Sequence, residues 1–134
     1  MTQTTEKYDA WPMDFGAVTL FVADLEVAKE FYHRAFGLPV IFEDNVSAVF
    51  KFGDMLVNLL KSTEATELVA PATVAGRDVG ARFAFSLAVD DVEGMCIELQ
   101  ERGVTMLNRP MIRPGFVRTA CFADPDGFIW EIVA

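Results

Sequence analysis

Residues 17–24, AVTLFVAD, and residues 84–91, AFSLAVDD, share one pattern of alternation. In both stretches every second side chain is apolar and bulky: Val18, Leu20 and Val22 in the first, and Phe85, Leu87 and Val89 in the second. The side chains between them are small or mixed in character. A period of two over this length is typical of a β-strand whose two faces are buried to different extents. The two stretches therefore predict two equivalent strands.

Each predicted strand leads into an amphipathic helix with the same start and stop signals. Asp24 and Gly37 bracket the helix predicted at residues 25–36, and Asp91 and Gly103 bracket the one at residues 92–102. Asp at the N-cap accepts hydrogen bonds from free backbone N–H groups, and Gly just past the end adopts the left-handed conformation that terminates a helix. The offsets are 91 − 24 = 67 for the caps and 103 − 37 = 66 for the glycines. This near-constant offset predicts an internal repeat.

Three short strand candidates follow each helix. In the first half they are residues 39–43, 46–52 and 55–60, with Gly53-Asp54 as a hairpin turn. In the second half they are residues 104–107, 116–123 and 128–133, with residues 124–127 as the turn. Each half therefore reads as a βαβββ unit, and the predicted fold class is α+β.

The chain divides around a polar, small-residue connector at residues 61–80. The first unit is expected at residues 15–60 and the second at residues 81–134, the two together making one structural domain. Residues 1–14 are expected to form a mobile N-terminal arm.

Charge and composition exclude several classes of function. The 134 residues carry a formal net charge of −9. Nucleic acid and anionic membranes need a basic surface, so neither is an expected partner. No apolar stretch approaches the roughly 20 residues that span a bilayer, and the N-terminal segment lacks the pattern of a secretory signal. With only two cysteines, a cytoplasmic protein without a disulfide framework is expected.

Four short phrases carry a family resemblance: VADL at 22–25, KEFY at 29–32, GL at 37–38 and DPDGFIWE at 124–131. Together with the repeated βαβββ unit, they resemble the vicinal oxygen chelate superfamily, which includes glyoxalase I, bleomycin-resistance proteins and extradiol dioxygenases. The resemblance covers roughly residues 15–134. It implies two modules whose curved mixed sheet forms an incomplete barrel around a cavity, with the helices on the convex face.

The resemblance also implies four positions at which metal-dependent members hold their metal: Ala17, Asn58, Ala84 and Glu131. Only Glu131 matches, since alanine has no donor atom and Asn58 offers one neutral oxygen. Zn, Ni, Fe and Mn sites generally need three or more N, O or S ligands. No metal and no other cofactor is therefore predicted, unless the chain is an enzyme whose metal ligands the resemblance does not identify.

Glu131 is the candidate catalytic residue and also a candidate ligand-binding residue. Strand alternation directs it toward the implied cavity, where desolvation would raise the pKa of a carboxyl group. It then acts as a general base or as a polar anchor for a ligand. The structural alternative is a remnant carboxylate hydrogen-bonded to Asn58 or to an arginine.

The other candidate ligand-binding residues are chosen by size and aromaticity. Small side chains at Ala17 and Ala84 leave volume for a ligand on the concave face, beside Asn58. Phe21 has the same parity as Ala17 and either stacks on a ligand or fills the core.

Two arginines near a Pro-rich segment, residues 109–116, are the last candidates for ligand binding. Arg113 or Arg118 could clamp a substrate carboxylate with two hydrogen bonds, because this segment is expected as a loop at the cavity mouth. Arg118 is expected close to Glu131. The alternative is that both arginines simply balance a very acidic surface.

Three other side chains are expected to be structural. His33 is expected on a solvated helix face, and Cys96 in the core, where free cysteine behaves as a small hydrophobe. Trp130 has the parity opposite to Glu131 and is expected to face a helix.

Two functions remain open at this point. The first is a metal-free protein of the glyoxalase/bleomycin-resistance type that binds a small, partly aromatic or amphipathic molecule in the concave cavity. The second is an enzyme of the lyase, isomerase or dioxygenase type, either metal-free with Glu131 as base or dependent on a divalent metal. A homodimer is expected in both cases, because members of the resembled family often pair modules across subunits.

Overall fold

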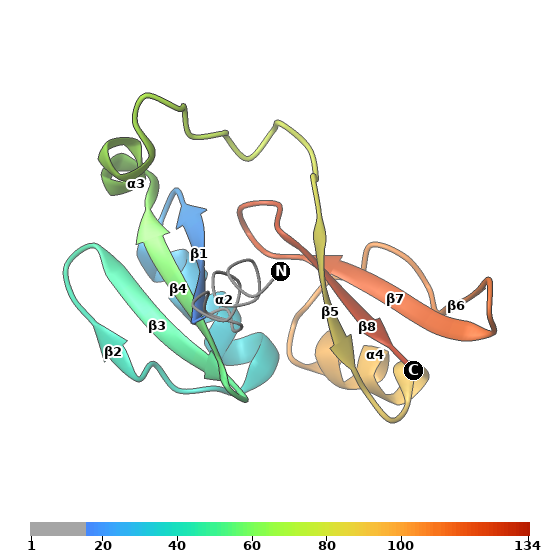
Figure 1. The fold of residues 1–134 in the computed structure, drawn as a ribbon. Helices are drawn as coiled ribbons and strands as arrows, with labels where there is room; N and C mark the ends of the chain where they lie inside the picture. The colour runs from blue at the N-terminus through green and yellow to red at the C-terminus, as the bar shows by residue number, and fades with distance from the viewer. Residues whose placement is uncertain (1–15) are drawn as a thin grey trace, which may run out of the picture.

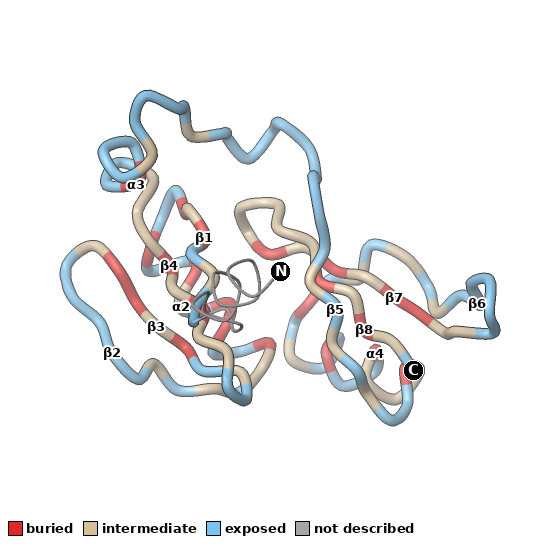
Figure 2. Tube along the Cα trace, in the orientation of Figure 1, coloured by how far each residue is buried: buried red, intermediate tan, exposed pale blue. Residues whose placement is uncertain are grey.

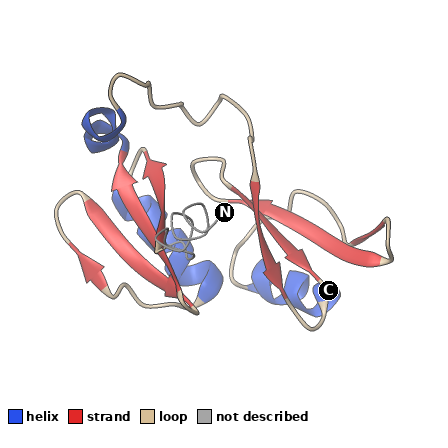
Figure 3. Ribbon diagram, in the orientation of Figure 1, coloured by secondary structure: helices blue, strands red, loops and turns tan. Residues whose placement is uncertain are grey.

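The computed structural model describes residues 16–134, so the arm predicted at residues 1–14 lies outside the described residues. The first unit consists of β1 (Ala17–Val22), α2 (Leu25–Phe36), β2 (Phe42–Glu43), β3 (Ser47–Phe52) and β4 (Met55–Lys61). The second consists of β5 (Ala84–Ala88), α4 (Val92–Glu101), β6 (Met111–Arg113), β7 (Val117–Ala123) and β8 (Ile129–Val133). Helix α3 (Ser62–Val69) and the chain after it cross from one unit to the other (Figures 1 and 3).

Both units have the same topology, which confirms the predicted α+β fold and its repeat. The first sheet has the strand order β1-β4-β3-β2 and the second has the order β5-β8-β7-β6. In each sheet the first and last strands of the unit pair in parallel, while the others pair antiparallel. Among the described residues no strand of one sheet pairs with a strand of the other. The chain therefore forms two separate four-stranded sheets and no closed barrel.

The predicted helix caps are confirmed in position, but they differ in bonding. Asp24 accepts a hydrogen bond from the N–H of Val27, and Gly37 has the left-handed φ of 68° that ends α2. Asp91 stands at the N-cap of α4, yet its side chain makes no capping hydrogen bond. The expectation that this carboxylate satisfies a free backbone donor is therefore wrong for the second helix.

The connector predicted at residues 61–80 contains one unexpected helix. Helix α3 begins directly after β4 and buries only Ala65, while most of its other side chains are exposed. In the described part of the chain, no helix has the length and apolarity needed to cross a bilayer.

The edge strand of the second sheet is not where the sequence placed it. Residues 104–107 form only one bridge, from Met106 to Phe122, whereas the edge strand is β6, inside the segment expected as a loop. The N–H of Val104 donates to the carbonyl of Leu99, and that of Gly103 to Gln100, as in a Schellman helix ending. Because Val104 is buried by this ending, residues 104–107 close the helix instead of extending the sheet.

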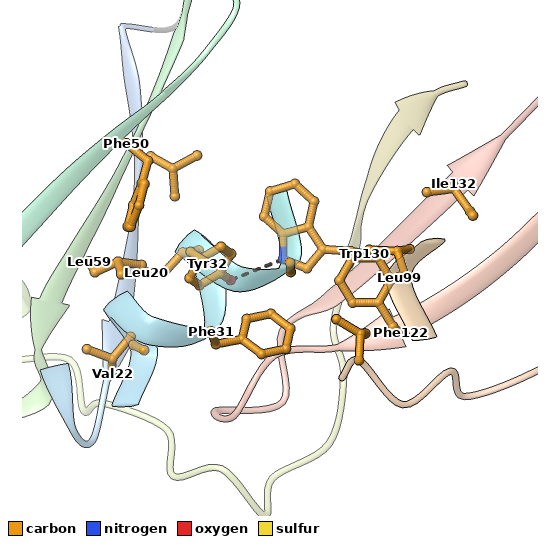
Figure 4. Packing of buried hydrophobic residues seen from close by; sticks show 14 of the residues in the cluster. Leu20, Val22, Phe31, Tyr32, Phe50, Leu59, Leu99, Phe122, Trp130 and Ile132 are labelled. Carbon is orange, nitrogen blue, oxygen red and sulfur yellow. Dashed lines mark hydrogen bonds between the residues drawn. The ribbon is translucent and has the colours of Figure 1, made fainter. Parts of the chain in front are cut away.

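One continuous core joins the two units, with α2 between them (Figures 2 and 4). The Phe52 ring, from β3, stacks on Trp130 of β8 at a centroid distance of 5.3 Å. Phe36 of α2 lies 4.9 Å from both of these rings. Trp130 is 2% exposed and its ring contacts Tyr32 and Phe36 of α2, so it faces a helix as expected. Burial of these large rings stabilises the contact between the units.

A buried hydrogen-bonded group also crosses between the units. The hydroxyl of Tyr32 donates to Asp124 Oδ2 at 2.5 Å. It accepts from Trp130 Nε1 at 3.1 Å, the bond marked in Figure 4. The other oxygen of Asp124 accepts from the N–H groups of Asp126 and Phe128, which shapes the turn before β8. Burial raises the pKa of Asp124, and the hydrogen bonds from Tyr32 and the turn oppose this shift. Burial and the neighbouring Asp124 raise the pKa of Tyr32, so its hydroxyl stays protonated and donates.

Candidate functional site

Each sheet has one face against a helix and one open face. Helix α2 packs on β3 and β4, and α4 packs on β7 and β8. Because the helix-facing sides of both sheets contribute to one core, the two open faces point away from that core. The two open faces therefore belong to two separate sheets.

The open face of the second sheet carries one acid among small and apolar side chains. The strand pairing sets out three rows across β5, β8 and β7. They are Ala84–Ile129–Ala123, Ser86–Glu131–Cys121 and Ala88–Val133–Thr119. Glu131 therefore lies at the centre of this nine-residue face, on the middle one of the three strands.

Glu131 is held by Ser86, which was not among the residues expected to contact it. The hydroxyl of Ser86 donates to Glu131 Oε1 at 2.7 Å, so the carboxylate is bonded neither to Asn58 nor to an arginine. Burial and the nearby Glu131 carboxylate raise the pKa of the Cys121 thiol on the other side. One carboxylate oxygen thus remains available beside a thiol that stays protonated at neutral pH.

The two candidate arginines lie on opposite faces of the second sheet. Arg113 donates from Nε to the hydroxyl of Thr119 at 3.3 Å, on the open face. Arg118 instead forms an ion pair with Glu93 of α4, on the helix-facing side. The expectation that Arg118 lies close to Glu131 is wrong. Glu131 pairs with Cys121, and Arg118 lies three residues before Cys121 on β7, so alternation places Arg118 on the opposite face of the sheet.

The open face of the first sheet repeats this arrangement with an amide in place of the acid. Ala17, Thr19 and Phe21 lie along β1, and Asn58 pairs with Thr19 on the neighbouring β4. Asn58 corresponds in topology to Glu131, as Thr19 does to Ser86. Asn58 Oδ1 is buried and accepts no hydrogen bond from the residues described. An acceptor in this condition is costly to keep unless something else binds it.

The four family metal positions do not form a metal site in this chain. Ala17 and Asn58 lie on the first sheet, and Ala84 and Glu131 on the second. Within residues 16–134, no three His, Cys, Asp or Glu side chains come together in a way that would hold an ion. The donor set is one amide oxygen and one carboxylate that already accepts from Ser86. These residues do not fit a divalent metal, so no step through a metal is derived.

The remaining expectations for single side chains hold. His33 is exposed on α2, and its Nδ1 lies 3.0 Å from the carbonyl oxygen of Leu38. Cys96 is 6% exposed and belongs to the core.

Phe21 is the one candidate that borders a cavity rather than only an open face. This cavity has a volume of about 320 Å³ and lies beneath the connector, between the end of β1 and the turn before β8. Arg82 also lines it and has the same parity as Ala84 on the approach to β5. Arg82 could have been identified from the sequence by continuing the alternation of β5 two residues upstream of Ala84. Ser86 would have been found by the same alternation, since it lies between Ala84 and Ala88.

Comparison with known proteins places this geometry in a family. The family model of the Glyoxalase/Bleomycin resistance protein/Dioxygenase superfamily matches residues 14–132. The chain is 31% identical over 120 residues to the uncharacterized protein YraH of Bacillus subtilis, covering 86% of this chain and 93% of YraH. It is 30% identical over 115 residues to the glutathione transferase FosA of Serratia marcescens, covering 86% of this chain and 76% of FosA. A glyoxalase/bleomycin resistance protein/dioxygenase from Nocardioides has the same fold, with a TM-score of 0.84 at 19% identity, over 99% of this chain and 91% of that one.

Proposed function

The chain belongs to the Glyoxalase/Bleomycin resistance protein/Dioxygenase superfamily, and we propose that it binds a small, partly aromatic or amphipathic molecule on its open sheet faces. The observation that carries this proposal is Glu131, a single acid at the centre of a face of small and apolar side chains. Such a face offers apolar contact together with one oriented acceptor, which is the usual composition of a small-molecule site.

The ligand is expected to be a hydrogen-bond donor or a cation at one end and apolar at the other. Ser86 orients Glu131, so that the second carboxylate oxygen is directed at the bound molecule. Ala84 leaves room above the carboxylate, and Arg113 sits at the far edge of the same face. On the first sheet, Ala17 and Asn58 are proposed to contribute in the same way.

A second copy of the chain would complete the site. Because the open faces point away from the shared core of one chain, two chains are needed to enclose a ligand between a first and a second sheet. We therefore propose a homodimer working in the cytoplasm. In the single chain Ala17, Ala84 and Ala88 are exposed on these faces, and a second copy would cover them.

An enzyme of glutathione-transferase type is the second candidate, favoured by the 30% identity to FosA. In that case Glu131 acts as a general base without a metal. Consumption of the glutathione thiol in the presence of 1-chloro-2,4-dinitrobenzene tests this, and loss of that activity in Glu131→Gln would support it. Absence of turnover with the folded protein leaves the binding proposal as the better one.

Isothermal titration with tryptamine and 2-naphthol tests the binding proposal. We expect one molecule bound per chain, with affinity for the amine about tenfold lower in Glu131→Gln, because a hydrogen bond to a charged group contributes about 1.5–3 kcal/mol. Glu67→Gln, an exposed acid on α3, is the matched control and should leave affinity unchanged. Equal affinity in the wild type and Glu131→Gln would rule out the anchor role. Light scattering should give twice the 14.8 kDa mass of one chain.

A further inference from the structure

The cavity beneath the connector is separate from the open face around Glu131. Its walls come from four segments: the end of β1, the start of α3, residues 73–83 of the connector, and the turn at residues 126–128. None of the nine residues of the open second face lines it. It is also built by a single chain, whereas the open faces need a second copy to become enclosed.

Three phenylalanine rings from different segments give the cavity an apolar lining. Phe21 comes from β1, Phe83 from the approach to β5, and Phe128 from the turn before β8. The rings of Phe83 and Phe128 lie 6.3 Å apart at an interplanar angle of 58°. Phe83 is 52% exposed, so a flat apolar ligand in the cavity would cover part of this ring.

Among residues 16–134, the charged side chains at the cavity leave the Arg82 charge without a partner. Asp126 is nearly buried, accepts from the N–H of Ala23 at 2.8 Å, and lies 3.7 Å from Arg77. Arg77 therefore offsets the Asp126 charge. Arg82 forms no ion pair or hydrogen bond with any residue in the described range 16–134. In a chain with a net charge of −9, this is a local positive site that favours an anion.

The size of the cavity restricts the ligand further. A volume of about 320 Å³ is at the lower end of the range of about 300–1,000 Å³ for small-molecule pockets. One or two fused rings with a single acidic group fit this space, whereas a larger drug-like molecule does not.

We propose that this cavity binds a small aromatic carboxylate, whose ring lies against Phe21, Phe83 and Phe128 and whose charge is taken by Arg82. This proposal goes beyond the one for the open faces, and its ligand has the opposite charge. Arginine suits this task because its planar guanidinium matches the two oxygens of a carboxylate.

Titration of the full chain with 2-naphthoate and with its neutral analogue 2-naphthamide tests the proposal. We expect one naphthoate per chain, bound about fivefold more tightly than the amide, because a partly exposed ion pair contributes modestly. Added salt should weaken naphthoate binding and leave amide binding unchanged. Arg82→Gln should reduce the naphthoate affinity to that of the amide. Arg109→Gln, which removes the same charge from another exposed position, should not.

Two further variants separate this site from the open face. Val74→Trp fills the cavity and should abolish naphthoate binding while circular dichroism shows a folded protein. Glu131→Gln should have no effect on naphthoate binding. Equal affinity for the two probes, no effect of Arg82→Gln, or no binding of naphthoate to the folded wild type would each overturn the proposal. Loss of binding in Glu131→Gln alone would place the probe on the open face instead.

Discussion

Replacing Tyr32 by Phe removes one hydroxyl group from the interior where the two units meet. In the native chain this group donates to Asp124 at 2.5 Å and accepts from Trp130 at 3.1 Å. The lost bond to the carboxylate is worth about 1.5–3 kcal/mol, and the buried indole N–H left without a partner costs about 1 kcal/mol or more. Asp124 keeps two backbone hydrogen bonds at its other oxygen, which limits the damage. We expect a loss of about 2–4 kcal/mol in the free energy of unfolding.

Urea unfolding followed by circular dichroism, together with calorimetry, measures this loss. For a chain of this size each kcal/mol corresponds to about 3–4 °C, so the Tm should fall by about 6–16 °C. Thr66→Val, which removes an exposed hydroxyl from α3, is the control and should change stability by less than about 0.5 kcal/mol. In a double-mutant cycle with Asp124→Asn, the two losses should be strongly non-additive. A loss below about 1 kcal/mol, or simple additivity, would refute the view that this hydrogen bond stabilises the contact between the units.

Three other outcomes are expected. The pKa of Asp124 is raised in the folded state, so this group stabilises the fold at acid pH, and the stabilisation is lost as the pH rises through the folded pKa. The urea midpoint of Asp124→Asn should therefore depend less on pH, between pH 4 and 7, than that of the wild type. Asp24→Ala should cost about 1 kcal/mol by removing a helix cap, whereas Asp91→Ala should cost clearly less, and equal losses in chemical unfolding would contradict this reasoning. Gly127→Ala should lower the free energy of unfolding by about 1–2 kcal/mol in the same assay, because φ at Gly127 is +90° and a Cβ there would lie 3.3 Å from a backbone oxygen. The control Gly76→Ala has open space around the added Cβ and should stay close to the wild type.

The repeat and its local signals were available from the sequence. Alternation in β1 and β5, the caps at Asp24 and Asp91, and the turn before β8 all depend on residues within a few positions of each other. These signals act through backbone conformation and nearest neighbours, so they hold without knowledge of the rest of the chain. The parity argument for Trp130 and Glu131 has the same local basis.

The position of each functional side chain depended on contacts far along the chain. Arg118 lies away from Glu131 because the register between β7 and β8 sets which residues share a face. Ser86 reaches Glu131 across 45 positions of sequence. Arg82 and Phe21 line the same cavity only because the connector folds over the end of β1. A shift of one residue in register exchanges the two faces of a strand, and alternation within one strand carries no information about its partner. The sequence by itself therefore determined the family fold and the residues with chemistry to offer, while tertiary pairing alone decided which of them meet.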